Sequence, residues 1–152
     1  MNDFNKIGFC GLFCGTCKIY LATNNNTLNL LAVDTGISID LLKCTGCRSL
    51  DVSLFCRSCA IKKCCIQKNI FSCADCNEFP CSVLKAFEND QHLHHKGVIP
   101  SLMELKATGK TKWLEKQINR WTCKVCGTPC SWYDEECGKC KKKFNGLKNN
   151  PT

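Results

Sequence analysis

Apolar residues recur at helical spacing near the start of the chain, in the segment TLNLLAVDTG at residues 27–36. This pattern predicts a short amphipathic helix that stops at Gly36, since glycine readily takes the left-handed conformation that ends many helices. Ser38 then offers an N-cap for another helical turn that leads into Cys44. The cysteine-bearing stretches CTGC, CRSC, CC and CADC are too short to predict helices or strands, so we expect turns there.

The middle of the chain, residues 82–122, carries the only long helical pattern. In PCSVLKAFENDQHLHH the apolar residues Val83, Leu84 and Phe87 lie at helical spacing. Polar Gln91 follows, so the apolar stripe is narrow. We therefore predict a helix here with a limited buried face.

Two further helical patterns complete this part of the chain. SLMELKATG begins with a capping box, Ser101 with Glu104 three residues on, and contains a stop signal at Gly109. KWLEKQINRW then predicts a helix that faces a core through Trp113, Leu114, Ile118 and Trp121. Such helices need something to pack on, which the cysteine-rich region supplies. Without metal, so thin an apolar core would give the fold only marginal stability.

The chain is unusually rich in cysteine, with 17 cysteines among its 152 residues. Residues 1–81 hold twelve of them, residues 82–122 none and residues 123–140 five. The odd total and the many C-x2-C pairs suit metal sites better than a disulfide framework. The N-terminus has no run of signal-peptide length, and no stretch reaches the roughly 18 apolar residues of a membrane span. We therefore expect a soluble, cytoplasmic metalloprotein.

The formal net charge of +8 treats every cysteine as neutral. Zinc ligands are thiolates, so a zinc ion with four of them carries a net charge of about −2. Four such sites would cancel the formal excess. The overall charge is therefore weak evidence for a nucleic-acid partner.

The clearest motif is WTCKVCGTPCSWYDEECGKC, near the end of the chain. It contains two C-x2-C pairs separated by ten residues, Cys123 with Cys126 and Cys137 with Cys140. Two facing turns of this kind close a tetrahedron around zinc, with sulfurs about 2.3 Å from the ion. The spacing predicts a zinc ribbon, with a rubredoxin-type iron centre on the same ligands as the alternative. Cys130 is left over; it could substitute in a five-cysteine site, but a spare or packing thiol is the favoured interpretation.

The cysteines of residues 1–81 could fill two or three further metal sites. Cys44 and Cys47 form one knuckle, whose partners could be Cys64 or Cys65 together with an early cysteine. Interleaved pairing is common in compact folds of this kind, so several groupings stay open. The most persuasive subset is a double pair with thirteen residues between its halves: Cys56, Cys59, Cys73 and Cys76. The remaining candidate ligands are Cys10, Cys14, Cys17 and Cys81.

Three of the early cysteines, Cys10, Cys14 and Cys17 in FCGLFCGTCKIY, follow the spacing C-x3-C-x2-C. Radical enzymes use this spacing to hold a four-iron cluster, but they also need a partial or full α/β barrel of about 200 residues or more. The chain has no run of alternating strands and helices, and neighbouring cysteines offer a fourth ligand. Structural zinc is the favoured interpretation, and a closed iron–sulfur cluster for electron transfer or sensing is the alternative.

The order of these motifs resembles that of a known family. FCGLFCGTCKIY, CTGCRS, CRSCAIKKCC, CADCNEFPC and WLEKQINRWTCKVCG follow one another as in the domain-of-unknown-function 3795 family, which comprises small cysteine-rich proteins of bacteria and archaea. The resemblance extends over residues 9–140. It implies one continuous unit from the cysteine-rich region to the ribbon, and binding of metal, expected to be zinc, by the matching cysteines. The family has no established activity, so the resemblance implies no catalytic residue.

The three histidines lie close together in QHLHHK, at His92, His94 and His95. No two of them are four residues apart, so we interpret them as cations near a helix C-terminus rather than as metal ligands. No Gly-rich phosphate loop, pair of carboxylates or Ser/His/Asp set can be read from the sequence. An enzyme is therefore not the favoured interpretation.

A basic run at residues 139–143 lies beside Trp132, Tyr133 and Phe144. Zinc ribbons can use such groups to hold phosphates and stack bases, which keeps a nucleic-acid partner as an alternative. Aromatic residues in ribbons usually pack against the zinc turns, however, and a lysine run is usually a solvated tail. A protein partner, bound by a scaffold of metal sites, is favoured.

Together these patterns predict a small, irregular α+β fold stabilised by two or more zinc ions. Residues 1–122 would form a cysteine-rich region of zinc knuckles with a helical middle, and residues 123–152 a zinc ribbon with a basic tail. Metal supplies folding free energy that the thin apolar core cannot, so strong chelation should unfold the chain. We expect the function to be binding, with mainly structural metal sites.

Overall fold

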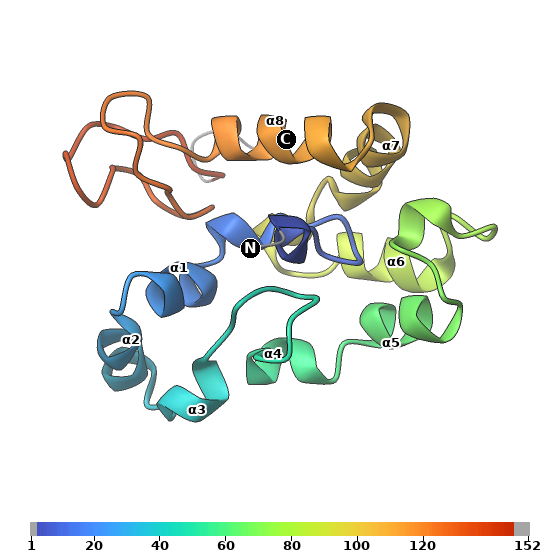
Figure 1. Ribbon diagram of the computed structural model, residues 1–152, viewed down its shortest axis with the longest axis horizontal. Coiled ribbons are helices and arrows are strands. Elements are labelled where there is room, and N and C mark those ends of the chain that lie inside the picture. The colour runs from blue at the N-terminus through green and yellow to red at the C-terminus, as the bar shows by residue number, and fades with distance from the viewer. Residues whose placement is uncertain (1–2, 148–152) are drawn as a thin grey trace.

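The computed structural model describes residues 3–147, which form a small, helix-rich fold (Figure 1). The α-helices of the described residues are α1 (Lys18–Asn24), α2 (Leu28–Thr35), α3 (Ile39–Leu42), α4 (Leu54–Arg57), α5 (Ala60–Gln67), α6 (Ser82–Glu88), α7 (Val98–Thr108) and α8 (Lys110–Arg120). Two short 3₁₀ helices precede α1, η1 (Asp3–Lys6) and η2 (Cys14–Thr16), and two lie between later helices, η3 (Cys73–Asp75) and η4 (Leu93–His95). In this part of the chain, β pairing is limited to three isolated antiparallel bridges: Ile7 with Phe13, Thr122 with Pro129, and Glu136 with Lys143.

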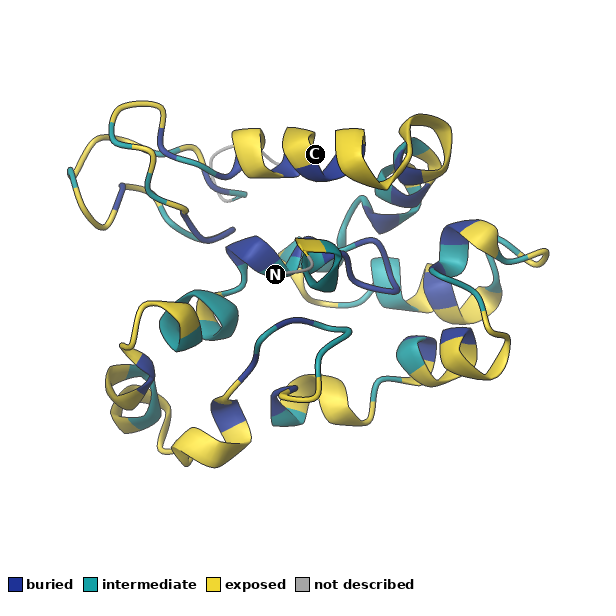
Figure 2. Ribbon diagram, in the orientation of Figure 1, coloured by how far each residue is buried: buried dark blue, intermediate teal, exposed yellow. Residues whose placement is uncertain are grey.

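The helices surround the N-terminal segment. In the view of Figure 1, α7 and α8 run along one side, α1 to α5 lie along the other, and the N-terminal residues lie between them. Figure 2 shows that the outward surface of α8 and much of α2 and α3 are exposed, whereas buried residues gather toward the centre. The N-terminal segment therefore forms part of the core rather than a free arm.

Two expectations near the start of the chain are confirmed. Helix α2 ends at Thr35, and Gly36 takes the left-handed conformation with φ of 69°. Ser38 occupies the N-cap position of α3 with extended backbone angles, although its side chain makes no capping hydrogen bond.

The expectation of turns around the middle cysteines is only partly right, because two of these stretches are helical. Cys56 lies in α4, and the adjacent Cys64 and Cys65 lie in α5. In α5, Ile61 and Cys65 are both buried, four residues apart on one face. Cysteine here acts as a small apolar residue that anchors a helix to the core.

The middle helices differ from the sequence pattern in their boundaries. Helix α6 ends at Glu88, and the histidine segment forms η4 after a turn. The predicted capping box with Ser101 as the N-cap is wrong, because α7 begins at Val98 and Ser101 lies inside the helix. The hydroxyl of Ser101 instead donates to the carbonyl of Gly11 at 2.9 Å, which ties α7 to the N-terminal segment.

The apolar core is more extensive than the sequence indicates. Helix α8 contributes Trp113, which is 1% exposed and donates from Nε1 to the carbonyl of Ser101 at 3.1 Å. The ring of Phe13 meets Trp113 edge-on at 6.4 Å between centroids. The buried core further comprises Ile7, Phe9, Cys10, Ile61, Cys65, Ala74, Leu84, Val98, Leu102, Leu105, Leu114, Trp121 and Trp132.

Two glycines permit close backbone approaches within this core. Gly11 has φ of +87°, and a Cβ placed there would lie 2.6 Å from Cγ of Leu102. Gly46 has φ of +116°, and its Cβ would lie 2.5 Å from the backbone oxygen of Asn5. Both positions combine a left-handed backbone with a contact that leaves no room for a side chain.

Arg48 links three segments of the cysteine-rich region. Its Nε donates to the carbonyl of Ile7 at 2.8 Å, and its Nη2 donates to the carbonyl of Phe71 at 2.5 Å. The guanidinium also lies over the rings of Phe9 and Phe71, 4.0 and 3.7 Å from their centroids. This cation–π and hydrogen-bond clamp fixes the CTGCRS stretch against the N-terminal segment.

Candidate metal centres

The first C-terminal C-x2-C pair lies in a tight turn. The backbone N–H of Cys123 donates to the carbonyl of Thr128 at 2.9 Å, and the carbonyl of Cys123 accepts from the N–H of Gly127 at 2.9 Å. Gly127 is left-handed, with φ of 73°. An antiparallel bridge between Thr122 and Pro129 closes the turn.

The second pair lies in a turn of the same design. The N–H of Cys137 donates to the carbonyl of Lys142 at 2.8 Å, and the carbonyl of Cys137 accepts from the N–H of Lys141 at 3.0 Å. Lys141 is left-handed, with φ of 60°, and a bridge between Glu136 and Lys143 closes the turn. Each feature lies fourteen positions after its counterpart, so equivalent backbones present the two cysteine pairs.

The four cysteines of these turns converge on one point. Sγ of Cys123 lies 3.6 Å from Sγ of Cys140, and Sγ of Cys126 lies 3.5 Å from Sγ of Cys137. All four Sγ atoms lie within 4.8 Å of one another. Cys123 and Cys137 are buried and the other two are half-buried. This donor set could hold one metal ion.

Local hydrogen bonds favour the thiolate form in this cluster. The hydroxyl and the N–H of Thr128 lower the pKa of Cys126 to about 6. Backbone N–H groups of its own turn, that of Cys140 first, lower the pKa of Cys137. The N–H of Lys142 also lowers the pKa of Cys140, but burial and the neighbouring sulfurs outweigh it and raise this pKa to about 11. A cation among the sulfurs would remove the repulsion that keeps the last proton bound.

Cys130 lies outside this cluster. Its side chain is 1% exposed, its Sγ lies 3.5 Å from the carbonyl oxygen of Thr128, and burial raises its pKa to about 12. Its backbone carbonyl accepts from the hydroxyl of Thr16 at 2.6 Å. Cys130 is thus a buried thiol beside Cys137, and its role as a packing thiol stays a prediction.

Backbone contacts bring several N-terminal cysteines together. The N–H of Cys47 donates to Sγ of Cys14, and the N–H of Phe9 donates to Sγ of Cys47. Burial raises the pKa of both Cys10 and Cys14, and the charge of Cys47 is the next cause. These cysteines are distant in sequence and meet because the CTGCRS stretch docks on the N-terminal segment.

Cys56 belongs to the same neighbourhood. Burial raises its pKa to about 11, and the charges of Cys47, Cys17 and Cys44 add to this effect. Among residues 3–147, only two sets of three or more candidate ligands lie within 4.8 Å of one another, and the C-terminal cysteines are one of them. The double pair of Cys56, Cys59, Cys73 and Cys76 is therefore not brought together at that distance.

Three further candidate ligands begin helices. Cys17, Cys59 and Cys81 occupy the N-cap positions of α1, α5 and α6. The first N–H groups of a helix have no partner within the helix and are free to bind a sulfur at this position. At Cys17, burial raises the pKa of the thiol, and the nearby N–H groups of Tyr20 and Ile19 offset part of this effect.

A separate pair of thiols involves Cys65, which the sequence left as an alternative to Cys64 in a partner role for the knuckle of Cys44 and Cys47. Sγ of Cys65 lies 3.8 Å from Sγ of Cys73, and their hydrogen bond lowers the pKa of Cys65 and raises that of Cys73. Nearby, Nζ of Lys68 donates to Sγ of Cys76 at 3.4 Å. Cys64, by contrast, is exposed on α5.

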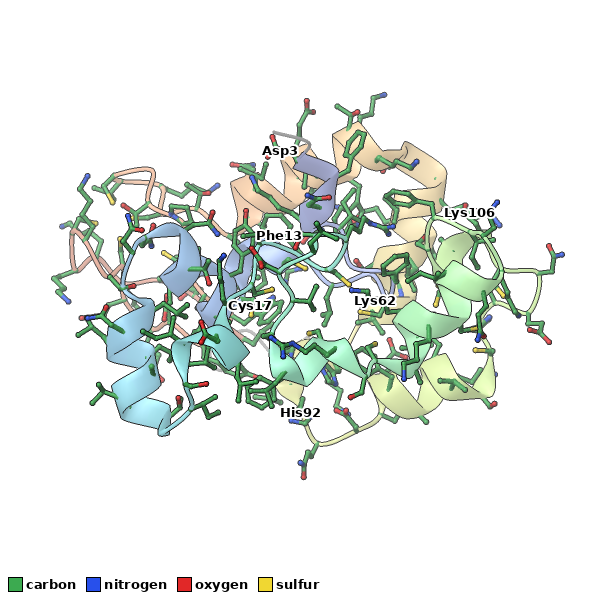
Figure 3. The ribbon with its side chains drawn as sticks, turned by 60° about the horizontal axis from the view of Figure 1, so that its bottom comes forward. Asp3, Phe13, Cys17, Lys62, His92 and Lys106 are labelled. Carbon is green, nitrogen blue, oxygen red and sulfur yellow. The ribbon has the colours of Figure 1, made fainter. Side chains whose placement is uncertain are left out.

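The second set of candidate ligands contains no cysteine. Asp90, His92 and His95 have donor atoms that all lie within 4.8 Å of one another. Sequence spacing missed this set because the histidines were compared only with each other. Asp90 lies two and five residues before them, and its carboxylate joins them across a turn. Figure 3 shows His92 on the loop that follows α6, at the edge of the molecule.

The aromatic residues beside the basic run are engaged in packing. The ring of Trp132 is buried and stacks on His94, with centroids 4.5 Å apart and an interplanar angle of 11°. The Tyr133 hydroxyl is hydrogen-bonded to Nδ1 of His94 at 2.6 Å. Phe144 packs against Trp121 with a centroid separation of 6.3 Å. These contacts join the C-terminal turns to η4 and α8.

The fold and these clusters define a small helix-rich protein with cysteine clusters that could bind metal. The family model described as protein of unknown function (DUF3795) matches residues 6–86, so the chain belongs to this family. The match includes every cysteine from Cys10 to Cys81 and ends before α7. No curated protein and no solved structure matches the chain. Within the described residues, no helix is both long enough and apolar enough to cross a membrane.

Proposed function

We propose that this protein binds zinc and that its four C-terminal cysteines form a structural zinc ribbon. The observation that carries the proposal is the convergence of Cys123, Cys126, Cys137 and Cys140 within 4.8 Å. In a tetrahedral zinc site with bonds of about 2.3 Å, the sulfurs lie about 3.8 Å apart. The two sulfur–sulfur distances of 3.6 and 3.5 Å are close to this value. Four protein ligands leave no open position on the ion, which makes the role structural.

The test compares two cysteine substitutions in the same region. Cys137→Ser removes one member of the cluster, whereas Cys130→Ser removes a buried thiol outside it. Elemental analysis of protein purified without oxygen should find about one zinc ion per chain fewer in Cys137→Ser, since a structural site needs all four ligands. Cys130→Ser should keep the zinc content of the unaltered chain. Equal zinc in the Cys137→Ser variant and the unaltered chain would overturn the proposal.

We also propose that the N-terminal cysteines bind metal, most of it zinc. The supporting observations are the buried Cys10, the half-buried Cys14 and Cys47, and the N–H groups that lower the pKa of the latter two against the effect of burial. Thiolate ligands do not by themselves choose zinc over iron, so an iron–sulfur cluster is the alternative. A colourless protein with further zinc ions supports zinc sites, and a brown protein with iron and sulfide supports an iron–sulfur cluster. Such sites need reduced thiols, which suits a cytoplasmic location.

We further propose that the metal sites act as a scaffold for binding a protein partner. Large apolar side chains are exposed on and between α2 and α4, with Val33 85% and Leu50 104% exposed. Leu30 and Phe55 are also exposed in this part of the chain, so several large apolar side chains are available to a partner. Crosslinking in cells should therefore yield a defined protein set that a Val33→Asp, Leu50→Asp variant loses. A protein set unchanged in that variant would show that the partner does not bind through Val33 and Leu50. A salt-dependent shift with RNA, without a defined protein set, would favour the nucleic-acid alternative.

A further inference from the structure

Asp90, His92 and His95 form a compact group of donors at the turn after α6 and at the end of η4. Nδ1 of His95 lies 2.7 Å from Oδ2 of Asp90, and Nδ1 of His92 lies 3.3 Å from Oδ1. All three donors lie within 4.8 Å of one another. The group shares no residue with the cysteine clusters.

These separations suit a metal ion. For bonds of about 2.1 Å, neighbouring ligand atoms lie about 3.0 Å apart in octahedral and about 3.4 Å apart in tetrahedral geometry. The Asp90–His92 distance of 3.3 Å falls within this range, and the Asp90–His95 pair, hydrogen-bonded at 2.7 Å, would have to separate only slightly to reach it. His92 is the most exposed of the three, with 49% of its side chain accessible, and has room to close on an ion.

Surrounding contacts hold the group in place before any ion binds. The N–H of His92 donates to Oδ1 of Asp90 at 2.8 Å, which leaves other lone pairs of the carboxylate available. Nζ of Lys96 donates to the backbone carbonyl of Asp90 at 2.6 Å. The ring of His95 stacks on Phe87 with centroids 3.8 Å apart. Such supporting contacts fix the orientation of ligands and strengthen metal binding.

The adjacent His94 is held outside the group. Its ring stacks on Trp132 and its Nδ1 bonds to the hydroxyl of Tyr133, both from the C-terminal region. This contact braces the histidine segment from the opposite side. The segment is thus clamped between α6 and the loop that joins the two cysteine turns.

We propose that Asp90, His92 and His95 form a second kind of metal site, which binds a divalent first-row transition-metal ion such as zinc. Two imidazoles and one carboxylate are donors that such ions accept readily. Three protein ligands leave at least one coordination position open to water or to an oxygen-containing ligand. The four-cysteine cluster offers no such position. The site is half-exposed, so an ion reaches it directly from solvent.

The test uses the full chain with its cysteine sites already loaded with zinc and free zinc removed. Calorimetric titration with Zn²⁺ should then detect one further binding event. Asp90→Asn and His92→Ala should each weaken that event by at least about a hundredfold, because even indirect partners of metal ligands cost about 10–100-fold when replaced. His92→Ala retains the backbone bond to Asp90, so it separates loss of the ligand from loss of the turn. Gln91→Ala, an exposed change in the same turn, should leave the event unchanged.

Cobalt distinguishes this site from the cysteines. Co²⁺ added to the zinc-loaded chain should show no thiolate-to-cobalt charge-transfer absorption, since its ligands are nitrogen and oxygen. The Cys137→Ser variant should still bind this ion, which separates the result from the zinc-ribbon proposal. The proposal is wrong if no further event is seen, if charge-transfer absorption accompanies it, or if Asp90→Asn and His92→Ala bind as Gln91→Ala does.

Discussion

The apolar core under α6, α7 and α8 and the cysteine cluster in residues 121–147 bury different kinds of side chain. The first buries residues such as Leu84, Leu102 and Trp113 from helices and from the N-terminal segment. In the second, the buried side chains are Cys123, Cys130 and Cys137, with Cys126, Cys140 and Phe144 against them. Hydrophobic burial can stabilise the first without help. The four-cysteine cluster itself buries little apolar carbon, although Trp121 and Trp132 of the same segment pack into the first core. In the proposed zinc ribbon, metal–thiolate bonds would supply the rest of the stability of these turns.

The largest effect should follow from removing metal. Structural zinc contributes apparent free energies of about 10–16 kcal/mol in small zinc domains, so the C-terminal turns should lose their structure when a strong chelator is added. Helices α6 to α8 should retain most of their helical signal, because they pack on apolar residues. Hydrogen exchange followed by peptide, with far-UV circular dichroism, measures both.

Two results would break this contrast. Equal loss of protection in α7 and in residues 121–147 would show that the apolar core also depends on metal, as the sequence pattern alone suggested. Unchanged protection of the C-terminal turns after verified metal removal would show that metal does not hold them.

The second largest effect should follow from a substitution in the apolar core. Trp113→Ala removes a side chain that is 1% exposed and should lower the free energy of unfolding by about 3–5 kcal/mol. Urea unfolding measures this loss, with Lys112→Ala on the exposed surface of α8 as the control. The zinc content of the folded variant should stay that of the unaltered chain. A loss of zinc in Trp113→Ala would mean that the core, rather than the turns themselves, positions the cysteines.

The two regions also differ in how far sequence could predict them. The C-terminal cluster was predictable because both cysteine pairs are local: each turn is closed by bonds within a few residues, and only ten residues separate the pairs. The N-terminal grouping was not, because Cys14 and Cys47 meet through the docking of two distant segments. That docking depends on the Arg48 clamp and on Gly46, whose partners no spacing rule reveals.

Two further differences between the sequence predictions and the structure, at α5 and at Asp90, have a common physical origin. Helix α5 was missed because its cysteines were counted as turn residues, although Ile61 and Cys65 show helical spacing once cysteine is treated as apolar. Asp90 was missed because an acidic residue in a polar loop carries no periodic signal. Its role depends on the turn that brings its carboxylate back to His92 and His95. In both cases the residue type allowed two interpretations, and tertiary contacts decided between them.

The smallest effect concerns the link between the two regions. Thr16 is fully buried in η2, and its hydroxyl donates to the carbonyl of Cys130 at 2.6 Å. Thr16→Val keeps the shape and removes this bond, so it should lower the free energy of unfolding by about 0.5–1.5 kcal/mol. Thr108→Val is the matched control, because the hydroxyl of Thr108 is exposed and bonds only to Glu104 within its own helix among the contacts described. We expect a smaller loss there.

Metal removal turns this substitution into a test of the whole comparison. If the C-terminal turns lose their structure without metal, Cys130 no longer presents a fixed carbonyl to Thr16. The cost of Thr16→Val should then fall to that of Thr108→Val in the chelated protein, while the cost of Trp113→Ala stays the same. A cost of Thr16→Val that survives chelation would mean that the segment around Cys130 stays docked on the core without metal. The division between a metal-held and an apolar-held region would then have to be drawn after Cys130 rather than at Trp121.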